Sequence, residues 1–148
     1  LSQMHIKEKQ QTFQKRRDEA LEKLKENPLL SCHTPDGAFY LFPNVSKVCE
    51  KLGIFDVYKQ LTGEEREVLS PSTIFQLFLL FNYQVAVIDR SSFGKVGGED
   101  EHFIRLSLAA ESSEILEGLK RLHQASYDVE GFQKFITESR DILTNYLS

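Results

Sequence analysis

The chain is poor in the residues that build disulfide scaffolds and metal centres. It has no tryptophan, one methionine and two cysteines in 148 residues. Cys32 and Cys49 are 17 positions apart, with no second cysteine pair and no histidine at a metal-ligand spacing. We therefore expect two free thiols rather than a disulfide or a zinc site, and we assign no metal ligand.

An excess of positive charge and long apolar runs are also missing. The formal net charge is −4 and the isoelectric point is near 5.6, which argues against a nucleic-acid or anionic-membrane binder. The longest apolar run is residues 77–81, far below the ~20 residues of a membrane span. The charged N-terminus has no signal-peptide core. These absences predict no nucleic-acid partner, no membrane partner and, by default, a cytoplasmic location.

The first third of the sequence predicts a helix followed by a hairpin. Residues 2–26 have amphipathic spacing, and Asn27-Pro28 ends the helix. The basic cluster Lys15-Arg16-Arg17 is followed at once by acidic residues, so we interpret it as a solvated helix face rather than a nucleic-acid site. Residues 29–32 and 38–42 are expected to pair as strands around an Asp36-Gly37 turn.

Helices are expected next along the chain. Residues 45–52 have helical spacing that Gly53 ends, residues 54–61 predict a short helix, and residues 62–67 are polar enough for an exposed loop. Ser70-Pro71 is a plausible N-cap and first-turn pair for a helix reaching Phe81. That helix is apolar around its whole circumference, so it either packs in the core or leaves a patch for another domain or subunit.

Arg105 is the main candidate for binding a ligand. It interrupts residues 102–109, which otherwise predict a buried strand, and a charge in an apolar interior requires an anionic partner. That partner is either a carboxylate of this chain or a ligand carboxylate held by the planar guanidinium. The loop with Gly94, Gly97 and Gly98 lacks both phosphate-binding glycine patterns.

Four segments together resemble one known family. They are Pro-Asp-Gly-Ala-Phe-Tyr-Leu-Phe-Pro (35–43), Val-Ala-Val-Ile-Asp-Arg-Ser-Ser-Phe-Gly (85–94), His-Phe-Ile-Arg-Leu-Ser-Leu-Ala (102–109) and the helical segment 111–122. In this order they resemble the C-terminal small domain of the class I/II pyridoxal-phosphate-dependent aminotransferases, which have the aspartate aminotransferase fold, fold type I. The resemblance covers roughly residues 4–122.

The resemblance implies a fold and a set of substrate-binding residues. We expect an α+β fold with a small antiparallel or mixed sheet of about three to four strands, covered by helices on one side. Arg105 takes the position of the arginine that binds the substrate α-carboxylate. Phe39 lines the substrate pocket by analogy, although a core aromatic residue is an equal alternative. Ser92 and Phe93 belong to a loop that closes over substrate in such enzymes.

The resemblance also implies that essential parts lie elsewhere. The family's Schiff-base lysine and cofactor-binding residues belong to a large domain that precedes the small one, so we assign this chain no catalytic and no cofactor-binding residue. We expect pyridoxal 5'-phosphate in a full-length homodimeric enzyme acting on amino acids and 2-oxo acids, possibly aspartate aminotransferase-like. The isolated chain, which begins at Leu1, is expected to be an inactive piece that binds no cofactor.

Two departures from the family and one extension complete the prediction. Tyr83-Gln84 replaces the usual glycine before the Val-Ala-Val segment, so that helix end should differ, and Arg90 replaces another common glycine. Residues 1–26 would be the connecting helix. Residues 123–148 predict an extra C-terminal helix that either packs back on the domain or joins a partner. The alternative function is a stand-alone, non-enzymatic α+β module that binds a carboxylate or a protein.

Overall fold

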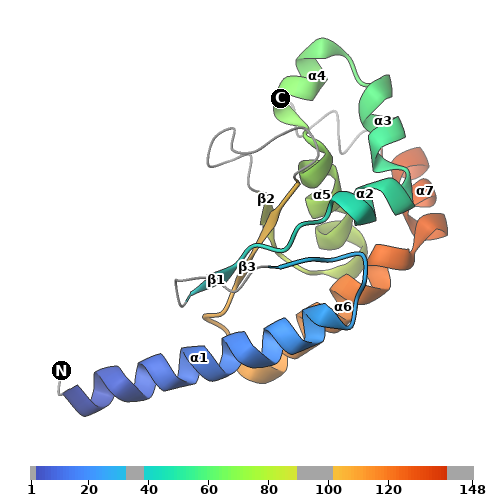
Figure 1. Ribbon diagram of the computed structural model, residues 1–148. Helices are drawn as coiled ribbons and strands as arrows, with labels where there is room; N and C mark the ends of the chain where they lie inside the picture. Colours follow the sequence, from blue (N-terminus) through green and yellow to red (C-terminus); the bar gives the residue numbers. More distant parts are fainter. Residues whose placement is uncertain (1–2, 33–38, 90–101, 140–148) are drawn as a thin grey trace.

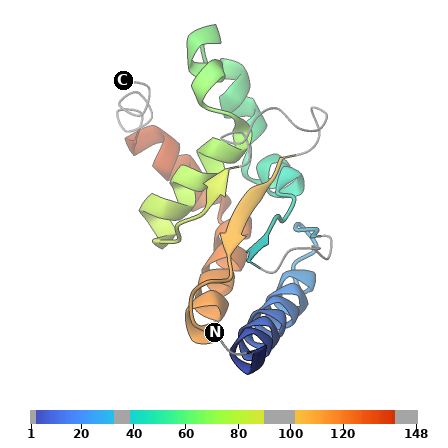
Figure 2. The same ribbon diagram turned by 90° about the vertical axis from the view of Figure 1, so that its left-hand side faces the viewer.

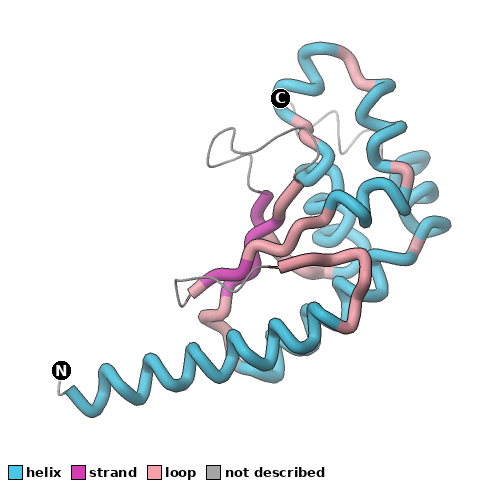
Figure 3. The backbone as a smooth tube through the Cα atoms, in the orientation of Figure 1, coloured by secondary structure: helices cyan, strands magenta, loops and turns pink. Residues whose placement is uncertain are grey.

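A computed structural model describes residues 3–32, 39–89 and 102–139 (Figure 1). The chain is mostly helical, as the backbone tube makes plain (Figure 3). Its elements, in order, are α1 (Gln3–Lys25), β1 (Tyr40–Leu41), α2 (Ser46–Leu52), α3 (Ile54–Gln60), α4 (Gly63–Val68), α5 (Pro71–Tyr83), β2 (Ile88–Asp89), β3 (Ile104–Ser107), α6 (Ser112–Tyr127) and α7 (Val129–Glu138).

The described sheet is small and antiparallel. Its order is β1-β3-β2, with Tyr40 opposite Ser107 and Ile88 opposite Arg105. Two of these strands have only two residues, so the sheet is smaller than expected. Helices dominate the fold. β3 lies in the middle of the sheet, between β1 and β2, and so brings together segments that are distant in the sequence.

One face of the sheet is buried against the helices. Leu41, Ile104 and Leu108 on this face have no exposed surface. Beneath them, α5 packs against β2, while α6 lies beside α1 and α2. The two ribbon views agree that α1 and α6 run side by side (Figure 2). Figure 1 shows that the N-terminal part of α1 extends past the rest of the domain. Burial of this apolar face is the main force that holds the sheet to the helices.

Several predicted helices are confirmed with their end signals. The helix predicted for residues 2–26 is α1, and the one predicted for 54–61 is α3. The C-cap of α2 is Gly53 in the left-handed conformation, with φ 82°. The N-cap of α5 is Ser70, whose hydroxyl accepts the Thr73 amide hydrogen at 3.2 Å. These caps satisfy main-chain groups that the helices leave unpaired.

The prediction of a loop over residues 62–67 was wrong, because the segment forms α4. The Thr62 hydroxyl accepts the Glu65 amide hydrogen at 3.1 Å, and the Glu65 carboxylate accepts that of Thr62 at 2.9 Å. This reciprocal pair is a capping box, which the Thr-x-x-Glu spacing encodes. High polarity therefore marked an exposed helix here, not an irregular segment.

The predicted hairpin is only partly present in the described residues. Ser31 and Asn44 form an isolated antiparallel bridge, and β1 pairs with β3 rather than with residues 29–32. The expected turn at Asp36-Gly37 lies outside the described residues. Asn44 also forms an antiparallel bridge with Phe103, so the chain after β1 lies beside the residue that precedes β3.

Gln84 ends α5, and the expected difference from the family at this helix end stays a prediction. Gln84 takes the left-handed conformation, φ 56° and ψ 38°, that usually favours glycine. Its backbone N–H donates to Leu79 O, so the α5 end closes as a glycine cap would. The cost of placing a side-chain-bearing residue there is about 1–2 kcal/mol.

The C-terminal extension packs back on the domain through α7. Its Phe132 and Phe135 are buried against Phe78 of α5, with Phe78–Phe132 ring centres 5.4 Å apart. Most of α5 is core, as its apolar circumference suggested, although Leu80 and Phe81 stay exposed. Residues 140–148 of the extension lie outside the described residues.

Among residues 3–32, 39–89 and 102–139, no helix combines the length and the apolar character that a membrane crossing requires.

Candidate substrate-binding face

Arg105 lies on the outer face of the sheet, opposite the core. Its neighbours on this face are Tyr40, Ser107 and the cross-strand residue Ile88. Tyr40 and Ile88 are 40% and 37% exposed, so this face is open at its edges. The expected burial of residues 102–109 holds for the core face, where Ile104 and Leu108 are buried, while Arg105 on the other face is only half-buried.

An aromatic ring meets the Arg105 guanidinium. The guanidinium carbon lies 4.4 Å from the centre of the Tyr40 ring. The electron-rich ring face attracts the cation. An arginine guanidinium can present two parallel donors to a carboxylate.

Phe39 is not a core residue. Its side chain is 54% exposed, and its ring meets the Phe13 ring edge-on, with centres 4.8 Å apart and planes at 71°. Phe39, Phe13, Arg16 and Ile6 line one hollow of about 820 Å³ along α1. The sequence alternative of a buried aromatic residue is thereby excluded, while its role toward substrate stays a prediction. Ser92, Phe93 and the neighbouring Arg90 lie outside the described residues.

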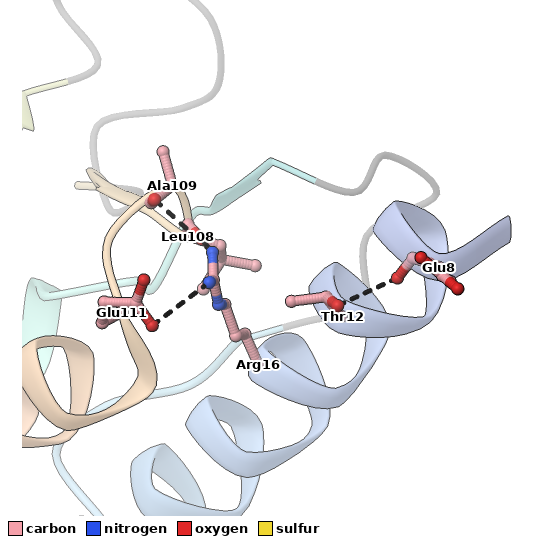
Figure 4. A network of polar contacts seen from close by, with 6 residues as sticks. All are labelled: Glu8, Thr12, Arg16, Leu108, Ala109 and Glu111. Atoms are coloured by element: carbon pink, nitrogen blue, oxygen red, sulfur yellow. Dashed lines mark hydrogen bonds and ion pairs between the residues drawn. The ribbon is translucent and has the colours of Figure 1, made fainter. Parts of the chain in front are cut away.

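The structure adds Arg16, which sequence reasoning assigned to a solvated face (Figure 4). Its side chain is only 13% exposed. Arg16 Nη1 donates to the carbonyl oxygens of Leu108 at 3.2 Å and Ala109 at 3.4 Å, and Nη2 lies 3.7 Å from Glu111 Oε2. The solvated interpretation was wrong for this residue. Its spacing from Phe13 and Ala20, three and four positions, could have placed it on the buried face.

The described residues do not fit a pyridoxal phosphate site. All ten described lysines, namely Lys7, Lys9, Lys15, Lys23, Lys25, Lys47, Lys51, Lys59, Lys120 and Lys134, are exposed. A Schiff-base lysine is activated by desolvation or by a neighbouring cation in a pocket, which these positions do not provide. In the same part of the chain, no group of three potential metal ligands comes together.

The buried Cys49 and the partly buried Tyr83 have shifted acidities without contributing to this face. Burial raises the pKa of the fully enclosed Cys49 thiol to about 12, so that thiol is a packing group. Burial and the Asp128 carboxylate raise the pKa of Tyr83 to about 12, and Tyr83 Oη donates to Asp128 Oδ2 at 2.6 Å. Both groups stay neutral at physiological pH.

Comparison with known proteins identifies the family. Residues 1–122 match the family described as Aminotransferase class I and II. The chain therefore belongs to the class I and II aminotransferases. It is similar to the "Probable aspartate/prephenate aminotransferase" of Aquifex aeolicus, with 33% identity over 124 residues, 84% of this chain and 26% of that protein. It is also 31% identical to the aspartate aminotransferase of Sulfurisphaera tokodaii over 80% of this chain and 25% of the relative.

Solved structures agree on the fold. The aspartate aminotransferase of Rhizobium meliloti superposes with a TM-score of 0.63 at 30% identity, over 85% of this chain and 28% of that one. An aromatic aminotransferase from Pyrococcus horikoshii gives the same TM-score at 26% identity, over 86% and 28%. The chain thus has an aminotransferase-like fold and spans about a quarter of the length of these relatives.

Proposed function

We propose that residues 1–148 form the C-terminal small domain of a pyridoxal-phosphate-dependent aminotransferase. Residues 1–26 would connect it to a preceding large domain that carries the cofactor, and residues 123–148 would be an added helical segment. The family match and the quarter-length coverage of the relatives support this assignment. Because the described lysines are all exposed, the cofactor chemistry is assigned to the other domain.

The observation that carries the proposal is the placement of Arg105 on an open sheet face. Its guanidinium lies over the Tyr40 ring, on the face of the sheet opposite the core, and the residue is half-buried. Arg105 would bind the substrate α-carboxylate with two parallel hydrogen bonds. Such a clamp fixes the orientation of the reacting carbon and lowers the entropy lost on reaching the transition state. Phe39 would add an apolar wall beside the carboxylate, and Ser92-Phe93 would cover the bound substrate.

The reaction would transfer an amino group from an amino acid to a 2-oxo acid. The cofactor, held in the large domain, would supply the electron sink for breaking the bond to the α-hydrogen. Because relatives are named for aspartate and prephenate, we propose acidic substrates for this enzyme. We further propose a cytoplasmic homodimer as the full-length form and no activity for the isolated 148-residue chain.

Arg105 variants in the longest natural polypeptide that contains this chain test the proposal. Arg105→Ala should lower kcat/KM by a factor equivalent to about 2–5 kcal/mol, since the substrate carboxylate loses a desolvated partner. Arg105→Lys should not restore activity, because an ammonium lacks the planar fork. Wild-type kcat/KM in Arg105→Ala would refute the role of Arg105.

The alternative is a stand-alone module that binds a carboxylate or a protein without catalysis. The exposed Leu80 and Phe81 on α5 are the observation in its favour. Borohydride treatment of the 148-residue chain with pyridoxal phosphate, followed by peptide mapping, tests whether this chain has a cofactor site of its own. Sparse labelling of many surface lysines fits a domain whose cofactor site lies elsewhere. A stoichiometric adduct on one lysine would instead indicate a self-contained enzyme.

A further inference from the structure

Arg16 forms the most enclosed arginine contact among the described ion pairs, and it joins the two segments that flank the candidate face. Resting on the proposed function, we propose that Arg16 is a positioning residue for that reaction. By fastening α1 to the end of β3, it holds Phe39, Tyr40 and thereby Arg105 in the substrate-binding arrangement.

The bonds of Arg16 are directed mainly at the backbone that follows β3. Its Nη1 donates to Leu108 O and Ala109 O, three and four residues beyond Arg105 (Figure 4). The ion pair with Glu111 adds little, because that carboxylate is 79% exposed and 3.7 Å away. A guanidinium with 13% exposure has lost most of its water, so removing it leaves two carbonyls to be resolvated.

A closed set of contacts connects Arg16 with Phe39. Leu108, whose carbonyl Arg16 binds, donates its own N–H to Phe39 O at 2.8 Å. The Phe39 ring meets Phe13 edge-on, and Phe13 also stacks under the Arg16 guanidinium at 5.4 Å. The segment before β1 is thus held on one side by the backbone of Leu108 and on the other by α1.

The same set of contacts extends to Arg105. Tyr40 follows Phe39 directly, pairs with Ser107 in the sheet and places its ring under the Arg105 guanidinium. A shift of α1 away from Leu108 therefore moves Phe39 and the Tyr40 ring together. Because a misplacement of about 1 Å can cost on the order of 100-fold in an enzyme, the effect on substrate binding should be measurable.

Arg66 provides a control that makes the same kinds of contact at an exposed position. It too donates to two consecutive carbonyls, Tyr58 O at 3.1 Å and Lys59 O, and lies over an aromatic ring, that of Tyr58, at 5.4 Å. These contacts join α4 to α3, at the opposite end of the domain from α1 (Figure 1). Arg66→Ala removes the same kinds of interaction without touching α1, β1 or β3.

The kinetic test uses the longest natural polypeptide that contains this chain. Arg16→Ala should raise KM for the amino-acid substrate about tenfold while kcat stays within about twofold, the pattern of lost ground-state binding. Arg16→Lys, which keeps a positively charged donor group but not the planar fork, should give a smaller rise in the same direction. Arg66→Ala should leave KM unchanged. An unchanged KM in folded Arg16→Ala, or an equal rise in Arg66→Ala, would overturn the positioning role. If Arg16→Ala does not fold, Arg16→Lys decides in its place.

A second readout separates this inference from the proposed function. In the 148-residue chain, the Tyr40 ring should shift the Arg105 side-chain Nε–H resonance upfield in NMR spectra. Arg16→Ala should move that resonance toward the position of an unstacked arginine, and Arg66→Ala should not. If the wild-type polypeptide transfers no amino group, the proposed function fails and this resonance alone decides whether Arg16 orients Arg105. An unmoved resonance in folded Arg16→Ala would then refute the inference.

Discussion

The guanidinium carbon of Arg105 lies 4.4 Å from the centre of the Tyr40 ring, diagonally across the β1–β3 pairing. Side chains two positions apart on paired strands share a face and remain within reach of a long arginine and an aromatic ring. The pairing register therefore determines the position of the guanidinium. A slip of one residue would move Arg105 to the core face, which holds the fully buried Leu41 and Ile104.

The Tyr40 ring should stabilise the domain through this contact. Tyr40→Leu should reduce the free energy of unfolding by about 0.5–1 kcal/mol more than Tyr40→Phe, because only phenylalanine preserves the ring face under the cation. Urea unfolding of both variants at low ionic strength measures the difference. Equal stabilities for the two variants would show that the ring contributes only apolar area.

The Tyr83–Asp128 hydrogen bond should make stability depend on alkaline pH. Folding raises the pKa of Tyr83 from its usual 10.0 to about 12, through burial and the neighbouring Asp128 carboxylate. This contribution is complete below pH 10 and is lost as the pH rises through about 12. Tyr83→Phe should therefore cost about 1 kcal/mol at pH 8 and progressively less toward pH 12.

Paired unfolding measurements on wild type and Tyr83→Phe at several pH values check this sign. Every other ionisable side chain is present in both proteins, so the difference between them reports on Tyr83. A cost that grows with pH would contradict the assignment of the shift to the protonated Tyr83.

Gln84 should be a site where glycine increases stability. Its φ of 56° strains a residue with a side chain, whereas glycine adopts this conformation freely. Gln84→Gly should add about 1 kcal/mol and raise Tm by about 3 °C, while Gln84→Ala should not. Calorimetry of the three proteins tests this. A lower Tm for Gln84→Gly would mean that the Gln84 side chain makes stabilising contacts that outweigh the strain.

Local signals in the sequence predicted the helices better than the sheet. The Ser70-Pro71 start of α5 and the Gly53 end of α2 are encoded by neighbouring residues, so both predictions were correct. The β1–β3 pairing joins residues more than 60 positions apart, and no local pattern specifies it. The two-residue strands β1 and β2 are held by tertiary contacts and gave no strand-length signal of their own.

The candidate site was predictable only in part for the same reason. The family-like motif selected Arg105, but only the pairing register shows that its face is open and that Tyr40 lies under it. Arg16 was missed because a basic cluster beside acidic residues is typical of a solvated helix face. Its bonds to Leu108 and Ala109 span more than 90 positions and follow from the packing of α1 against the domain.

The α7 extension should be essential for stability, although it lies beyond the family match that ends at residue 122. Phe132 is 1% exposed and packs edge-on against Phe78, which is fully buried. Phe132→Ala should therefore cost about 3–5 kcal/mol, since it removes apolar contacts and leaves a cavity between α5 and α7.

Phe81→Ala is the matched control for this prediction. The Phe81 ring also belongs to the α5–α7 cluster, stacking near Phe135 at 6.5 Å, but its side chain is 50% exposed. Its removal should cost no more than about 1.5 kcal/mol, because water already covers half of the ring. Urea unfolding measures both losses. Similar small losses would mean that α7 detaches before the domain unfolds, whereas a large loss for Phe132→Ala alone would make α7 part of the cooperative core.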